Sequence, residues 1–155
     1  MGILVDDLTA GVEGWRAATG LDDWYVVTYD AEEIDGLSYH GSPGSFAMRL
    51  ALAGQAPQIE FIEPLRGPSI YGDWIAERGY GMHHLGFHVD DIMAAVAAMA
   101  ADGFEPIQSG FGYGADGDGG FAYYEVPSLS PLIVEIIEVP TQRRPSEPLE
   151  SRTAN

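Results

Sequence analysis

The chain has 155 residues, and 24 acidic side chains against seven basic ones give it a formal net charge of −17. All seven bases are arginines and cysteine is absent, which excludes a lysine Schiff base, a disulfide framework and a zinc–sulfur cluster. Nucleic-acid binding is not expected, because no cationic stripe is available for phosphates. No apolar run approaches the roughly 20 residues that span a bilayer, and the N-terminus lacks a basic signal, so we expect a cytoplasmic protein without a membrane partner.

The predicted elements fall into two similar series. The first begins with an apolar run at 1–5 and a helix that Asp6 or Asp7 caps and Gly20 ends. Three strands and a short linker helix then follow, at 24–29, 45–52, 58–64 and within 67–79. The second series repeats this order with a strand, a capped helix and three further strands, at 84–89, 90–103, 104–109, 121–126 and 132–139.

The two series also match in sequence. MGILVDDL at the start corresponds to LGFHVDDI at 85–92, and IEFIEP at 59–64 corresponds to VEIIEV at 134–139, so that Glu60 matches Glu135. One βαβββ unit leaves a sheet face uncovered, and two such units are therefore expected to share a core or enclose a cleft. We predict a single α+β domain over 1–140, made of modules at about 1–66 and 80–140 with the linker at 67–79.

The last part of the chain differs from these modules. After Pro140 the sequence TQRRPSEPLESRTAN has no apolar periodicity. Residues 141–155 are expected to form a polar tail that is disordered or loosely held, because such a segment has no apolar face to bury.

Several phrases resemble one family. GPSIY, GYGMHHLGFHVDDI, GGFAYYEV and the closing VEIIE are similar to the vicinal oxygen chelate superfamily (glyoxalase/bleomycin resistance/dioxygenase), especially its glyoxalase-like and methylmalonyl-CoA epimerase-like branch. The resemblance covers about 1–140. It implies an eight-stranded cup formed by two βαβββ modules, a divalent metal ion at its centre, and a homodimer.

The same resemblance implies three metal ligands, namely Glu60, His84 and Glu135. Alternation along a strand agrees, because Glu135 shares a face with Ile133 and Ile137, where an unpaired carboxylate would be costly. These donors favour manganese, cobalt, nickel, iron or magnesium over a structural zinc, although zinc stays among the candidates.

The sequence departs from the family pattern in two places. The partner of His84 in the first module would fall one place before Met1, so we expect a three-ligand site; alternatively, the sequence starts too late. The epimerases resemble one another in a further glutamate that transfers a proton, but SYHGSPGSFAMRL holds no acid here. His40 is the nearest titratable group and could replace it.

Other residues are weaker candidates. His88 shares a face with His84, and Trp74 and Tyr123 could line an apolar substrate pocket, although each could also be a packing residue. His83 points to the other face and is expected at the surface or behind the ligand.

The resulting functional prediction is a metal-dependent isomerase, epimerase or lyase that acts on a small carbonyl or acyl compound through an enolate. A cation beside a carbonyl acidifies the neighbouring C–H, and Glu135, Glu60 or a histidine would move the proton. Two alternatives stay open, namely a metal-free protein that sequesters small molecules and a ring-cleaving dioxygenase.

Overall fold

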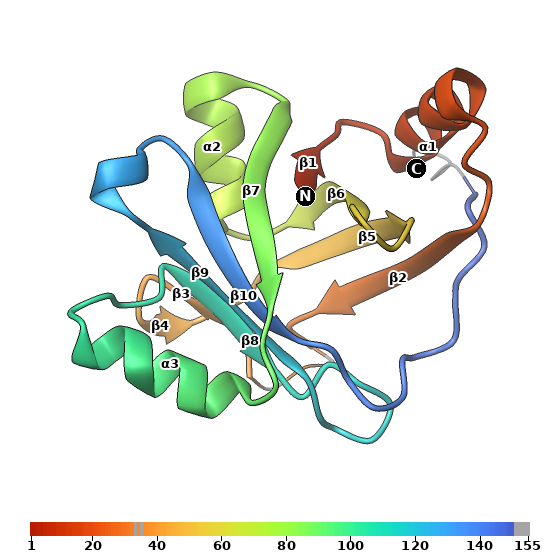
Figure 1. The fold of residues 1–155 in the computed structure, drawn as a ribbon. Coiled ribbons are helices and arrows are strands. Elements are labelled where there is room, and N and C mark those ends of the chain that lie inside the picture. The colour runs from red at the N-terminus through yellow and green to blue at the C-terminus, as the bar shows by residue number, and fades with distance from the viewer. Residues whose placement is uncertain (33, 35, 151–155) are drawn as a thin grey trace.

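The computed structural model describes residues 1–32, 34 and 36–150, and in this part of the chain ten strands form one curled sheet (Figure 1). The first half contains β1 (Gly2–Leu4), α1 (Leu8–Thr19), β2 (Trp24–Asp30), β3 (Ser38–Tyr39), β4 (Ser42–Pro43), β5 (Ala47–Ala53) and β6 (Ile59–Arg66). The second half contains α2 (Ile70–Arg78), β7 (Gly81–His88), α3 (Ile92–Ala101), β8 (Gln108–Phe111), β9 (Gly120–Glu125), the short 3-10 helix η1 (Pro127–Leu129) and β10 (Ile133–Glu138).

The sheet has an internal symmetry around its two central strands. Its strand order is β2-β5-β6-β1-β7-β10-β9-β8-β3-β4. The first strand of each half, β1 or β7, is parallel to the closing strand of that half, β6 or β10. β1 and β7 pair with each other antiparallel and join the two halves edge to edge. This architecture confirms the predicted α+β fold of paired βαβββ units.

Each half is covered by one helix on its outer side (Figure 1). Asp7 and Asp91 cap α1 and α3 by accepting hydrogen bonds from backbone N–H groups of the first turn. The apolar side of α1 packs on β2, β5 and β6 through Leu8 and Val12, whereas α3 packs on β9 and β10 through Ile92. A larger apolar cluster lies between the two halves of the sheet. No helix within the described ranges is long and apolar enough to cross a membrane.

A small hairpin was not predicted from the sequence. β3 and β4 form it around His40 and Gly41, both of which have positive φ angles, 47° and 73°. Two positive φ values in a two-residue loop are typical of the tight turns that suit hairpins. β3 pairs with β8, so a piece of the first half extends the edge of the second half.

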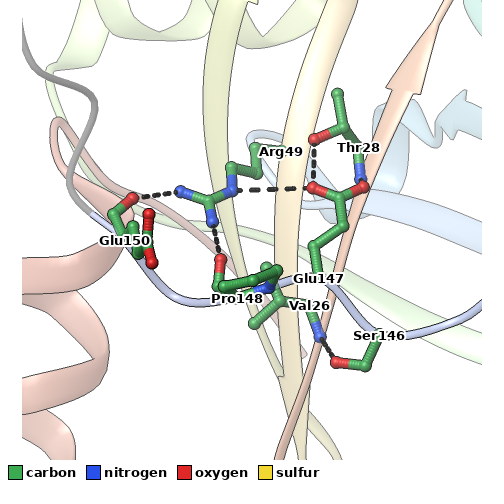
Figure 2. A network of polar contacts seen from close by, with 7 residues as sticks. All are labelled: Val26, Thr28, Arg49, Ser146, Glu147, Pro148 and Glu150. Atoms are coloured by element: carbon green, nitrogen blue, oxygen red, sulfur yellow. Dashed lines mark hydrogen bonds and ion pairs between the residues drawn. The ribbon is translucent and has the colours of Figure 1, made fainter.

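The prediction of a loosely held tail is wrong for residues 141–150. This segment runs along the edge strand β2, where the Glu147 N–H donates to Val26 O at 2.8 Å and the Val26 N–H donates to Ser146 Oγ at 3.0 Å. The Glu147 carboxylate accepts hydrogen bonds from the backbone and side chain of Thr28 (Figure 2). Polar groups therefore hold this segment in place, and apolar periodicity does not report such contacts. The predicted part at 151–155 lies outside the described residues.

Candidate metal centre

Two glutamates and one histidine from three strands meet at the middle of the sheet. Nε2 of His84 on β7 lies 3.0 Å from Oε2 of Glu135 on β10 and 3.2 Å from Oε2 of Glu60 on β6. One potential ligand atom from each residue lies within 4.8 Å of the other two. The side chains of His84 and Glu135 are 1% and 4% exposed, and that of Glu60 is 14% exposed. We call these three residues the triad.

Strand register explains why the triad residues meet. β7 places Gly86 opposite Glu135 on β10, and β1 places Gly2 opposite Glu60 on β6. Gly2 also pairs with His84 across the junction of the two halves. A Cβ atom on Gly2 would lie 1.9 Å from Cε1 of His84. The imidazole therefore uses the space that a glycine leaves open. The register also makes Gly2 the counterpart of Gly86, which puts the counterpart of His84 one place before Met1.

Aromatic rings support the triad from the side of β9 and α2. The ring of Tyr123 lies 5.0 Å from that of His84, and its hydroxyl accepts a hydrogen bond from Tyr71 at 3.0 Å. Nδ1 of His83 lies 3.0 Å from Nδ1 of His84. His83 is buried, so of the two predicted positions it takes the one behind the ligand and not the one at the surface.

Burial and charge oppose each other at His84. Burial by itself lowers the pKa of the imidazole, but the carboxylates of Glu135 and Glu60 outweigh it and raise this pKa to about 9. Burial raises the pKa of Glu135, and the positive charge of His84 counteracts this rise. Burial and the neighbouring His84 lower the pKa of His83 to about 3. The environment therefore favours a positive charge between the two carboxylates and keeps His83 neutral.

The donor atoms of the triad fit a divalent cation. Among the described residues, Oε2 of Glu135 is buried without an aligned hydrogen bond, although His84 Nε2 is 3.0 Å away. A buried carboxylate oxygen in this state is costly unless a cation faces it, which is either the protonated His84 or a bound metal ion. Two carboxylates and one imidazole suit manganese, cobalt, nickel, iron or magnesium. Glu60, His84 and Glu135 would hold such an ion, and water or substrate would take its other positions.

The triad lies in the wall of a cavity of about 440 Å³. Both halves of the sheet contribute to this wall, and β5 presents only apolar side chains to it, namely Met48, Leu50 and Leu52. His88 and Tyr123, two of the predicted pocket residues, line the cavity as well. An apolar wall with a few polar groups gathered at one place is typical of small-molecule sites.

Two predicted residues lie elsewhere. The side chain of His40 is 53% exposed at the tip of the β3–β4 hairpin, where Nε2 lies 3.6 Å from an oxygen of Asp73. Trp74 lines a separate pocket, and its ring lies 5.1 Å from that of His83. The structure therefore does not bring His40 to the triad as a base or Trp74 to the pocket as a substrate contact. Hairpin geometry carries His40 away, and Trp74 packs on His83 beside a separate pocket.

Two of the cavity-wall residues that sequence reasoning missed bear on function. Arg143 and Tyr25 both line the cavity, and the Arg143 guanidinium lies 5.0 Å from the centroid of the Tyr25 ring. Arg143 belongs to the segment that the sequence predicts to be a disordered or loosely held tail. No periodicity marks it, and only the repeated arginines at 143–144 in a lysine-free chain could have drawn attention to it.

The fold and the triad together define an α+β protein whose paired βαβββ modules enclose a candidate metal site. A sequence model described as the Glyoxalase/Bleomycin resistance protein/Dioxygenase superfamily matches residues 1–124. The chain belongs to this superfamily, which confirms the resemblance drawn from its sequence.

Solved structures share this fold. A methylmalonyl-CoA epimerase in complex with methylmalonyl-CoA and NH4+ is 21% identical, with a TM-score of 0.63 over 93% of this chain and 94% of that one. A Streptomyces coelicolor methylmalonyl-CoA epimerase variant in complex with 2-nitronate-propionyl-CoA is 23% identical, with a TM-score of 0.62 over 88% and 92%. The Mycobacterium tuberculosis methylmalonyl-CoA epimerase is 21% identical, with a TM-score of 0.61 over 90% and 85%. No curated protein sequence matches the chain.

Proposed function

We propose that the chain is a metal-dependent enzyme of the glyoxalase or epimerase type, which removes a proton next to the carbonyl of a small carbonyl or acyl substrate. The observation that carries this proposal is the triad, in which His84 Nε2 lies within 3.2 Å of two carboxylates in a cavity wall. Epimerases with the same fold support the reaction type. An acyl thioester is one candidate substrate, because two of those structures hold CoA thioesters.

Metal chemistry and protein chemistry would divide the reaction between them. A divalent ion supplies a Lewis acid that acidifies the C–H bond beside a bound carbonyl and stabilises the enolate. Glu60 and Glu135 provide the negative charge that retains the ion, and His84 completes the donor set. We assign proton transfer to Glu135 or to His88, both of which line the cavity.

The apolar wall has a role in this proposal. Met48, Leu50 and Leu52 on β5, the strand next to the one that carries Glu60, give the cavity an apolar wall, and an apolar wall strengthens the electrostatic interactions inside the cavity. The same three residues leave β5 without a carboxylic acid at the cavity, which agrees with the missing acid in the sequence. Proton transfer by a group on β5 is therefore not part of the proposal.

A metal-free binding protein is the second candidate function. The observation that favours it is the contact of His84 with both carboxylates, because a protonated imidazole satisfies them without an ion. The dioxygenase alternative has no such support, since the triad holds one histidine where that chemistry needs two.

The first experiment is metal analysis of the purified protein after reconstitution with manganese, cobalt, nickel, iron or zinc. We expect one ion per chain in the wild type and in His40→Ala, and loss of the ion in His84→Ala. His40→Ala is the matched control, because it removes a histidine that lies away from the cavity. Absence of metal from the wild type after every reconstitution would leave the binding protein as the better interpretation.

Activity is tested by solvent deuterium exchange. Carbonyl and acyl compounds with acidic C–H bonds are incubated in D2O with metal-loaded protein, and the exchange is followed by NMR. We expect deuterium exchange that depends on the metal. The exchange rate should fall by about a hundredfold or more in Glu135→Gln if Glu135 is the base, or in His88→Gln if His88 is the base. Metal-loaded protein that exchanges no substrate in such a panel would contradict the enolate chemistry.

A further inference from the structure

Arg143 gives the cavity a positive charge that lies apart from the triad. It follows β10 in the chain, and its side chain lines the cavity together with Tyr25. The guanidinium carbon lies 5.0 Å from the centroid of the Tyr25 ring, within cation–π range. Of the lysine and arginine side chains within the described ranges, Arg143 is the one in the cavity wall.

The segment around Arg143 is anchored on both sides. Before it, the Thr141 N–H donates to Asp118 at 2.7 Å, and the Gln142 carbonyl accepts from the Ala115 N–H at 2.9 Å. After it, the Arg144 carbonyl accepts a hydrogen bond from the Tyr25 hydroxyl at 3.0 Å. The backbone of Arg143 is thus fixed between these contacts, and its guanidinium packs over the Tyr25 ring.

The charge of Arg143 is not neutralised by a neighbouring carboxylate. Four other arginines form ion pairs, namely Arg16 with Asp22, Arg49 with Glu147, Arg66 with Asp30 and Glu32, and Arg78 with Glu77. Within the described part of the chain, no such pair involves Arg143. In a chain of net charge −17, a cavity arginine without an acidic partner is available for an anionic ligand.

Two tyrosines share the cavity wall with the arginine and the triad. Tyr29 and Tyr113 line the cavity, and their ring centroids are 5.2 Å apart. Burial raises the pKa of both hydroxyls; the negative charge of Glu60 raises it further, and the positive charge of Arg143 lowers it. Both tyrosines therefore share the cavity wall with the triad and Arg143, and charges from both act on them.

We propose that Arg143 binds a carboxylate of the substrate, and that the substrate is a small acid whose carbonyl oxygen faces the triad. A guanidinium fork suits a carboxylate because it can donate two parallel hydrogen bonds. A volume of about 440 Å³ lies toward the small end of ligand pockets, which span roughly 300–1,000 Å³. The position of the carbonyl rests on the proposed function, whereas the carboxylate contact rests on Arg143 alone.

The test compares acids with their uncharged esters. Linear oxo acids from pyruvate to 5-oxohexanoate, and the methyl ester of each, are titrated into wild type, Arg143→Gln, Arg143→Lys and Arg144→Gln by calorimetry. We expect at least one acid to bind the wild type about tenfold more tightly than its ester, since one charge-assisted contact contributes that much. Arg143→Gln should abolish the difference, and Arg143→Lys should retain part of it. Arg144→Gln, which removes the same charge one residue further along, should retain it fully.

The outcomes separate this inference from the proposed function. Titrations are repeated with EDTA, and metal content is measured for each variant. The inference is supported if Arg143→Gln loses the difference in affinity between acid and ester while its metal content is unchanged. If the wild type keeps this difference in the presence of EDTA, the inference is supported even if the metal proposal fails. Equal binding of acids and esters by the wild type, or no binding of any acid, would overturn it. Tighter binding of inorganic phosphate than of every oxo acid would also overturn the carboxylate assignment, and a change confined to the melting temperature would reduce Arg143 to a structural contact.

Discussion

Gly2 determines how closely β1 can approach the imidazole of His84. Any side chain there meets the ring, because a Cβ atom would lie 1.9 Å from Cε1. We expect Gly2→Ala to displace His84 and to weaken metal binding about tenfold or more, as disturbed ligand orientation does elsewhere. Isothermal titration with manganese measures the change.

The control for this substitution is Gly14→Ala. Gly14 lies in α1 with no neighbouring atom within 4 Å of an added Cβ, so alanine should stabilise the helix by up to about 1 kcal/mol without altering the metal site. Equal manganese affinity in Gly2→Ala and the wild type would show that the imidazole has another position available.

At the same scale, the sequence located the triad well and its surroundings less well. The resemblance to the superfamily points to Glu60, His84 and Glu135, and strand alternation together with the match of Glu60 to Glu135 agrees with it. His40 was a reasonable base in the sequence, but its position in a hairpin turn carries it into solvent beside Asp73. A one-dimensional pattern gives the face of a strand, whereas the path of a loop depends on contacts distant in the chain.

The segment at 141–150 is the element that the sequence described least well. It follows the edge strand β2, and Figure 2 shows how its carbonyl groups and carboxylate meet Arg49 and Thr28. These contacts protect a strand edge that would otherwise expose unpaired backbone groups. Each partner is more than 90 positions away in the chain, and such a separation leaves no local pattern.

This element gives a stability prediction. Glu147→Gln keeps the size of the side chain but removes the charge that accepts hydrogen bonds from Thr28 at 2.7 and 2.8 Å. Because Glu147 is partly exposed, we expect a loss of about 1 kcal/mol and a melting temperature about 2–4 °C lower. Calorimetry measures this, and hydrogen exchange at the Thr28 amide should accelerate. Glu13→Gln on the exposed side of α1 is the control, and equal melting temperatures for the two variants would contradict the anchoring role.

At the scale of the whole molecule, the triad links the two halves of the sheet. Glu60 belongs to the first half, and His84 and Glu135 belong to the second. Without metal, the protonated His84 attracts carboxylates from both halves, so its ionisation contributes to the stability of the whole fold.

This linkage predicts how the stability of the metal-free protein depends on pH. The pKa of His84 rises from 6.5 in the unfolded chain to about 9 in the folded one. A raised pKa means that its stabilisation is complete below pH 6.5 and is lost as the pH approaches 9. We expect the melting temperature in EDTA to fall across this interval, and to fall less in His84→Gln. In the control His40→Gln, the melting temperature should depend on pH as it does in the wild type. If the melting temperature of the wild type falls with pH no more than that of His84→Gln, the assigned pKa is contradicted.

The sequence by itself determined the βαβββ repeat and the helix caps, because strand alternation, capping and repetition are local patterns that survive in one dimension, and its resemblance to the superfamily pointed to the three residues of the triad. Only the tertiary structure decided that His40 and Trp74 lie away from the cavity, that residues 141–150 follow β2, and that Arg143 reaches the cavity wall. The reason is physical: these placements come from hydrogen bonds and ring contacts between distant segments, and chain folding creates them without any period in the sequence.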